Sequence, residues 1–367
     1  MDEFSKIVLD YAGLEGSIRA GIATIDTLTG GPTSTDLSYV LPGAKSAVVF
    51  SFAMDQSAIP DYLGKKNRRG YEKEYYNVNS ISSGVAVKMQ GFLRERGHQA
   101  AALAANDVYR TDPELGPNRL YPPVSLRYLA AASGVATFGW SGNMIDEKHG
   151  ACIILGGVVT TAELTPTAPL NQDDNYCDGC RICSAACTSR LMNHDKMTEV
   201  TLGDHTFSYS ARRTYLRCAY VCGGYTGLHK SGKWSTWSPG RFPIPEQDEE
   251  FLELLVGAGQ LSGERPVGEG GRYHSLMNHK LYTTCGNCQI VCVPDKEERK
   301  RRLNLLKNSG VVLQNADGSL EPIAAEDAEK RLSAMTEEQR RLYTGRPEAP
   351  EEMKPLLADA LKHFIVN

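Results

Sequence analysis

Cysteine spacing carries the clearest chemical signal in this 367-residue chain. Four cysteines follow one another as Cys177-x2-Cys180-x2-Cys183-x3-Cys187. This spacing is typical of bacterial ferredoxins, in which the first three thiolates hold one [4Fe–4S] cluster and the fourth ligates a neighbouring cluster. The run therefore predicts two clusters rather than one.

A second, shorter run supplies most of the remaining ligands. It reads Cys285-x2-Cys288-x3-Cys292, and Cys218 or Cys222 upstream can complete the eight thiolates that two clusters need. We assign one cluster to Cys177, Cys180, Cys183 and Cys292, and the other to Cys187, Cys285, Cys288 and one of Cys218 and Cys222. Cys152 lies in an apolar segment and is interpreted as a small buried hydrophobic residue.

Structural zinc is the alternative, because paired C-x2-C motifs also build tetrahedral zinc sites. Zinc ribbons do not need a third cysteine at the next x2 step and a fourth at x3. The spacing therefore favours iron–sulfur clusters over zinc.

Composition narrows the class of protein further. The formal net charge is −4, which argues against a general nucleic-acid or membrane-surface binder. Two local basic runs, 65–69 and 296–302, are interpreted as solvated faces, with an anionic ligand as the alternative. No stretch reaches the roughly 18 apolar residues of a membrane span. Ten cysteines without an export signal predict a reducing, cytoplasmic location.

The elements that must position the cysteines form a layered α/β domain. Hydrophobic patterns predict helices over 4–14, 79–97 and 125–133, and buried strands over 19–25, 47–52 and 151–160. We therefore expect an α/β domain at 1–170, a ferredoxin-like double-cluster module at 171–305 and a helical extension at 306–367. The aromatic loop 233–242 is interpreted either as a roof over an apolar cavity or as a loop packing its own aromatics.

The arrangement resembles a known family, the epoxyqueuosine reductases and reductive dehalogenases, over about 20–306. Three segments and a tripeptide carry the resemblance: the run from Pro122 to Ala130, Phe138-Gly139-Trp140-Ser141-Gly142-Asn143, the strand from Gly150 to Val159, and Leu216-Arg217-Cys218. The tripeptide resembles the family's segment before the second cluster motif, so the resemblance favours Cys218 over Cys222.

By this resemblance the α/β domain is expected to bind cobalamin base-off. No D-x-H-x-x-G segment is present to offer a histidine to cobalt, and no G-x-G-x-x-G follows a strand to bind a dinucleotide. Glycines allow close backbone approach, and serine and asparagine can bond corrin amides. The expected cobalamin contacts are Phe138, Gly139, Ser141 and Asn143.

The proton donor departs from the family pattern. Where epoxyqueuosine reductases carry acidic residues, this chain has Leu120 and Leu126, and Asp107 and Asp112 are off the matching spacing. Reductive dehalogenases use a tyrosine supported by a cation. The expected catalytic residues are therefore Tyr121 and Tyr128, with Arg127 as the cation.

Together with the two predicted clusters, the resemblance implies an oxidoreductase that passes electrons from the clusters to cobalamin and reduces a small organic substrate, as reductive dehalogenases do. A low-potential ferredoxin or flavodoxin is expected as the electron donor. The alternatives are an epoxyqueuosine reductase acting on tRNA, a partner considered improbable from the charge and the missing carboxylate, and a non-catalytic electron-transfer protein.

Overall fold

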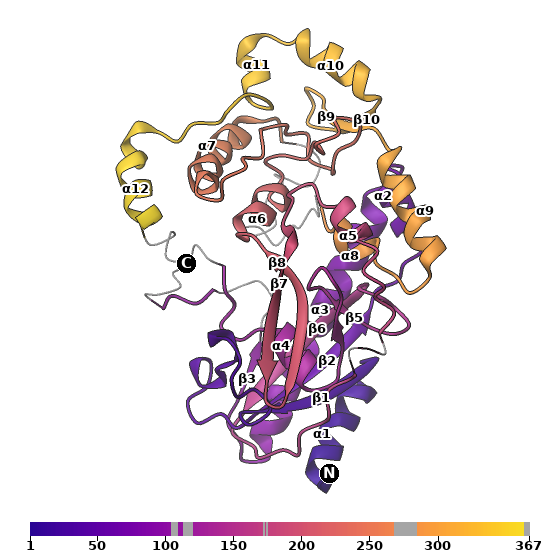
Figure 1. Cartoon of the computed structure of the whole chain (residues 1–367), viewed down its shortest axis with the longest axis vertical. Coiled ribbons are helices and arrows are strands. Elements are labelled where there is room, and N and C mark those ends of the chain that lie inside the picture. The colour runs from indigo at the N-terminus through magenta and orange to yellow at the C-terminus, as the bar shows by residue number, and fades with distance from the viewer. Residues whose placement is uncertain (104–108, 113–119, 172, 174, 268–284, 363–367) are drawn as a thin grey trace.

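The computed structural model describes residues 1–103, 109–112, 120–171, 173, 175–267 and 285–362. Its centre is a four-stranded antiparallel sheet with strand order β1-β2-β6-β3 (Figure 1). The strands are β1 (Arg19–Thr24), β2 (Ser46–Ala53), β3 (Ala100–Leu103) and β6 (Ile153–Thr160). All the strands and helices predicted for the α/β domain are confirmed. Helix α3 is longer than predicted, because it begins at Arg69.

The side chains of β2 point alternately to the two faces of the sheet, and apolar clusters cover both faces. Val48 and Phe50 pack into one apolar cluster together with helices α1 (Glu3–Leu14) and α3 (Arg69–Glu95). Ala47 and Val49 point the other way, into a cluster that contains helix α4 (Leu126–Ala132). Because successive strand side chains point to opposite faces, one uniformly apolar strand serves both layers.

A long hairpin from the predicted cluster module also joins this second layer. It consists of β7 (Met192–Leu202) and β8 (His205–Arg212), and Phe207 and Tyr209 share an apolar cluster with residues of α4. The α/β layer and the cysteine-rich segment are therefore packed together through the hairpin, across the boundary expected near residue 171.

The remaining elements surround the cysteines and the C-terminal end. They are β4 (Thr137–Phe138), β5 (Met144–Ile145), α2 (Ile59–Leu63), α5 (Ile182–Ala185), α6 (Leu216–Cys222), α7 (Glu250–Glu264), α8 (Asn287–Ile290), α9 (Lys296–Lys307), β9 (Val311–Gln314), β10 (Leu320–Ile323), α10 (Ala325–Ser333), α11 (Glu337–Arg341), α12 (Lys354–Lys362) and the 3₁₀ turns Thr33–Thr35, Leu37–Tyr39 and Glu351–Met353. The segment expected to be a helical extension contains α10, α11 and α12, and before them the hairpin β9–β10.

The aromatic loop 233–242 packs against the body of the protein. Trp234 and Trp237 are buried, and the indole of Trp237 donates a hydrogen bond to the carbonyl of Tyr62 at 3.0 Å. Phe242 lies in a separate apolar cluster with Tyr220 and Phe251. The aromatic side chains of this loop therefore pack against other parts of the protein rather than against one another. Among the described residues, no helix is long and apolar enough to cross a membrane.

Candidate functional site

The two cysteine runs form matching turns that face each other. Cys183 lies on the short helix α5 and Cys288 on α8, and these helices are in contact. Each helix is preceded by a residue in the left-handed region, Arg181 at φ 57° and Gly286 at φ 105°. The left-handed residue reverses the chain directly after Cys180 and Cys285, so that both runs bend the same way. Arginine pays a steric cost there that glycine avoids.

One group of thiols gathers around the first run. Cys177, Cys180, Cys183 and Cys292 line one small cavity. Burial raises the pKa of Cys183 to about 12, and burial also raises the pKa of Cys292 to about 11. These thiols therefore stay protonated at neutral pH unless a metal takes the place of the proton.

The last cysteine of the second run reaches this group because the α/β domain holds its backbone. The amide of Ala151 donates to the carbonyl of Cys292 at 2.8 Å. A Cβ on the neighbouring Gly150, which has φ +67°, would come within 2.3 Å of that carbonyl oxygen. Only glycine fits this approach.

The second group of thiols has five members. Cys288 interacts electrostatically with Cys187, Cys218 and Cys285, and Cys222 is hydrogen-bonded to Cys218 and Cys285. The sulfur atoms of Cys218 and Cys222 are 3.5 Å apart on neighbouring turns of α6. Either Cys218 or Cys222 could therefore serve as the eighth ligand. The described residues contain no group of three or more His, Cys, Asp or Glu side chains arranged around a single metal ion. A cubane does not require one, because each of its irons takes its own thiolate.

Hydrogen bonds reach sulfur atoms in both groups. The amide of Trp140 donates to Cys177 at 3.2 Å, and the guanidinium of Arg299 donates to Cys180 at 3.2 Å. The side-chain amide nitrogen of Asn143 lies 3.8 Å from the sulfur of Cys288. Such donors stabilise thiolates and tune cluster potentials. The donor chemistry and these contacts fit two [4Fe–4S] clusters.

Of the four expected cobalamin contacts, Phe138 ends β4 and the other three lie in the turn between β4 and β5, near the thiol groups. The ring of Phe138 is buried and stacks on Tyr209 at 4.7 Å between centroids. Ser141 is buried, and its hydroxyl accepts a hydrogen bond from the backbone amide of Asn143. The side chain of Asn143 accepts from Arg212 at 2.9 Å, and Gly139 lines the first thiol cavity. Their polar groups are engaged within the protein, so these four residues do not fit a corrin surface.

Two of the expected catalytic residues lie together: the guanidinium of Arg127 is over the ring of Tyr128, 5.5 Å from its centroid. The hydroxyl of Tyr128 is hydrogen-bonded to that of Tyr209 at 3.0 Å, and burial raises the pKa of Tyr128 well above its ordinary value. Tyr121 is half-buried, and its carbonyl accepts from the amide of Arg110. The hydrogen bonds of the Arg127 guanidinium go to the carbonyl of Gly142 and to the hydroxyl of Tyr215.

Tyr215 is the residue that sequence reasoning missed. Its hydroxyl accepts hydrogen bonds from Arg127 at 3.0 Å and from Arg212 at 3.2 Å. Burial alone would raise the pKa of this phenol, but the two guanidinium groups outweigh burial and lower it to about 8. A phenol flanked by two cations is a stronger acid, because its anion is stabilised. The signal in the sequence was Arg212-Arg213-Thr214-Tyr215, placed just before Cys218.

The carboxylate alternatives are weaker. Leu120 packs on the cluster of Tyr220 and Phe251, so its position carries an apolar side chain within an apolar environment. Asp112 is held by Arg110 at 2.6 Å, and this hydrogen bond lowers the pKa of Asp112, which disfavours the protonated form a proton donor needs. Asp107 lies outside the described residues.

The two groups of thiols could hold iron–sulfur clusters, and the chain is similar to proteins of known activity. No family model matches the chain. The chain is 25% identical over 184 residues to the epoxyqueuosine reductase of Synechococcus sp. (strain RCC307), a match that covers 50% of the chain and 51% of the relative. The chain therefore spans about half the length of the curated relative it matches.

Similar solved structures come from both groups that the sequence resembles. An epoxyqueuosine reductase bound to an epoxyqueuosine-modified tRNA-Tyr stem loop is 16% identical, with a TM-score of 0.42, over 99% of this chain and 82% of that one. The Bacillus subtilis epoxyqueuosine reductase is 17% identical, with a TM-score of 0.43, over the same shares. A reductive dehalogenase is 10% identical, with a TM-score of 0.47, over 95% of this chain and 42% of that one. At these scores the structural likenesses carry no argument by themselves.

Proposed function

We propose that the chain is an iron–sulfur reductase that works on epoxyqueuosine or a closely related epoxide. The interleaving of the two cysteine runs carries the proposal, because Cys292 lies with the first run and Cys187 with the second. When bound, two [4Fe–4S] clusters would supply single electrons at low potential. Their ligands would be Cys177, Cys180, Cys183 and Cys292 for one cluster, and Cys187, Cys285, Cys288 and Cys218 or Cys222 for the other.

The proposed substrate, an epoxide, differs from the small organic substrate of the dehalogenase-like function that we expected from the sequence. The curated relative is an epoxyqueuosine reductase, which supports the alternative better than the main expectation. Accordingly, tRNA becomes a proposed partner rather than an improbable one. Removal of an epoxide oxygen as water consumes two electrons and two protons. Tyr215 delivers one of these protons, and Arg127 and Arg212 hold the phenol and stabilise the phenolate that remains.

Reduction of a small halogenated substrate is the second candidate function. A specific observation favours it: the position expected to carry an acid is Leu120, in apolar surroundings, while a cation-supported tyrosine is present. A tyrosine donor suits an apolar pocket and a halide leaving group.

The two candidates are separated by one experiment. Anaerobically reconstituted protein is reduced chemically and given either an anticodon stem loop carrying epoxyqueuosine or a brominated phenol. We expect conversion of the stem loop to the queuosine form, detected by mass spectrometry of its nucleosides. Release of bromide without stem-loop conversion would replace the epoxide proposal by the dehalogenase one. Failure with both substrates, in protein with a full iron content, would refute both.

Cobalamin binding stays a prediction from the resemblance, and we derive no step through it because the four expected contacts do not fit. We expect cobalamin added to the reconstituted protein to bind base-off, since none of the eight histidines lies in the required motif. The Co(II) paramagnetic resonance spectrum tests this. Nitrogen superhyperfine splitting, or an unchanged spectrum of free cobalamin, would contradict the prediction.

A further inference from the structure

One asparagine side chain joins the second group of thiols to the residues around Tyr215. Asn143 lies in the turn between β4 and β5. Its side-chain nitrogen lies 3.8 Å from the sulfur of Cys288, and its side-chain oxygen accepts a hydrogen bond from the guanidinium of Arg212 at 2.9 Å. The same guanidinium donates to the hydroxyl of Tyr215 at 3.2 Å. A chain of polar contacts therefore runs from a proposed cluster ligand to the proposed proton donor.

The neighbours of Asn143 fix the orientation of its side-chain amide. An asparagine amide has one end that accepts hydrogen bonds and one end that donates them, whereas a guanidinium only donates. The oxygen of Asn143 must therefore face Arg212, and the nitrogen then faces the sulfur of Cys288. Arg212 also interacts electrostatically with Cys288. Arg212 thus decides that a donor, and not an acceptor, lies against this sulfur.

The backbone of the turn holds Asn143 and Arg212 in this arrangement. The Nε atom of Arg212 donates to the carbonyl of Ser141 at 3.0 Å, and the backbone amide of Asn143 donates to the hydroxyl of Ser141 at 3.3 Å. Between them Gly142 has φ +75°, and a Cβ on it would come within 2.8 Å of the ring of Tyr209 and 3.1 Å of Nε of Arg212. The missing side chain lets the guanidinium lie against the turn.

A second arginine closes the network around the phenol. Arg127 donates to the carbonyl of Gly142 at 2.9 Å and to the hydroxyl of Tyr215 at 3.0 Å. The phenol is therefore tied to the same turn from two sides, by Arg127 of α4 and by Arg212 of β8. Hydrogen bonds in such a network polarise one another, so a change of charge at one end affects the other end.

We propose that Asn143 is a positioning residue, oriented by Arg212, that raises the reduction potential of the cluster at Cys288 and links this cluster to the proton donor. The proposal rests on the proposed function for the roles of the cluster and of Tyr215. Hydrogen bonds to the sulfurs of a cluster favour its reduced form, which is the more negative one. Asn143 itself exchanges neither an electron nor a proton.

The test compares two substitutions of Asn143 in the reconstituted full chain. Asn143→Leu removes both polar ends of the amide at similar volume. Asn143→Asp keeps an oxygen for Arg212 but places a second oxygen, instead of the N–H group, against Cys288. The midpoint potentials of both clusters are measured by redox titration with dithionite, followed by paramagnetic resonance. The signals of the two clusters are told apart by comparison with Cys187→Ala and Cys292→Ala.

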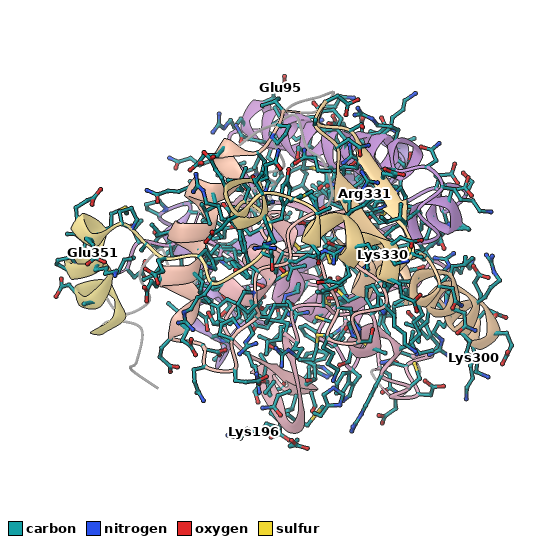
Figure 2. The ribbon with its side chains drawn as sticks, turned by 90° about the horizontal axis from the view of Figure 1, so that it is seen from above. Glu95, Lys196, Lys300, Lys330, Arg331 and Glu351 are labelled. Atoms are coloured by element: carbon teal, nitrogen blue, oxygen red, sulfur yellow. The ribbon has the colours of Figure 1, made fainter. Side chains whose placement is uncertain are left out.

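Asn315 offers a matched control. Its side-chain oxygen also accepts from an arginine, Arg331 at 2.7 Å, and its side-chain nitrogen donates to the hydroxyl of Ser319 at 3.0 Å. Arg331 belongs to the C-terminal helix α10 (Figure 2). Asn315→Leu and Asn315→Asp therefore remove the same kind of contacts without touching a thiol that the proposed clusters use.

We expect both Asn143 variants to lower the potential of the second cluster. At a fixed solution potential the ratio of its reduced to its oxidised form should fall about tenfold, as the loss of a hydrogen bond to a charged group predicts. The first cluster should be unchanged in the same molecules, and the Asn315 variants should change neither cluster. An unchanged second cluster in Asn143→Asp, or an equal shift in the control variants, would overturn the proposal. Asn143→Asp decides the matter even where Asn143→Leu loses iron.

The role of Arg212 is tested by a double-mutant cycle with Arg212→Met. Without the guanidinium the amide of Asn143 is free to turn, so Asn143→Leu should shift the potential by less in this background than in the unaltered protein. Equal shifts in the two backgrounds would show that Arg212 does not orient Asn143, and this outcome would remove the link to Tyr215.

Failure of the proposed function would look different. Protein that holds both clusters but converts neither substrate would refute the proposed function alone, because the potentials are measured without substrate. Protein that binds no iron at the second group of thiols would refute both the function and the role of Asn143.

Discussion

Replacement of Cys292 by alanine is expected to remove the cluster of the first cysteine run, although Cys292 belongs to the second run in sequence. Iron should fall from about eight to about four atoms per chain, because a cubane that loses one of four thiolates is not retained. The reason is structural: Cys292 lines the same cavity as Cys177, Cys180 and Cys183. Iron and sulfide analysis after anaerobic reconstitution gives the count.

Two further variants make this prediction sharp. Cys187→Ala should remove the other cluster, and the two lesions should leave different paramagnetic resonance signals after reduction. Cys152→Ala is the control, since Cys152 is a buried cysteine that lies 3.8 Å from the guanidinium of Arg302 and outside the cavity. It should retain about eight irons. Loss of the second-run cluster in Cys292→Ala would show that the runs are not interleaved.

The grouping of the thiols was predictable because covalent spacing already constrains it. In Cys177-x2-Cys180-x2-Cys183 every ligand lies within one turn of the next, so local geometry decides which sulfurs share a face. The choice between Cys218 and Cys222 was not predictable. They are four residues apart on α6, and residues at that spacing lie on the same side of a helix. Their side chains therefore reach the same group.

The buried strands were predictable for a similar reason. Val48, Val49 and Phe50 form a continuous apolar run, which is typical of a strand covered on both faces. The hairpin β7–β8 was not expected, because its burial pattern is irregular and is interrupted by a bulge between Met192 and Met197. Only its contacts with α4 and β4 explain why it folds there.

The contacts of the proposed catalytic residues were the hardest part of the site to predict. Tyr128 stands beside Arg127 in the sequence, and its ring lies beneath the Arg127 guanidinium, but its hydroxyl is hydrogen-bonded to Tyr209. The partner of Arg127 is Tyr215, which follows the end of β8. Pairing between residues so far apart depends on the packing of the hairpin against α4, and no local pattern encodes it.

Tyr215→Phe is expected to lower the turnover number by about 10²–10⁴-fold while both clusters stay in place, because it removes the proton donor and nothing else of similar size. Tyr128→Phe is the matched control. It also deletes one buried hydroxyl, but one that is hydrogen-bonded to the hydroxyl of Tyr209, so turnover should change by only a few fold. A larger loss in Tyr128→Phe than in Tyr215→Phe would remove Tyr215 from the mechanism.

The pH profile separates proton donation from a structural role of Tyr215. A proton donor acts in its protonated form, which predominates below its pKa, so turnover should fall as the pH rises through about 8. The charged groups that face this phenol are Arg127 from α4 and Arg212 from β8, and the thiol of Cys218 from α6 opposes them. Arg127→Gln removes one cation and should move the falling limb to higher pH. If turnover falls at the same pH in Arg127→Gln as in the unaltered protein, the fall reports the titration of a group other than Tyr215.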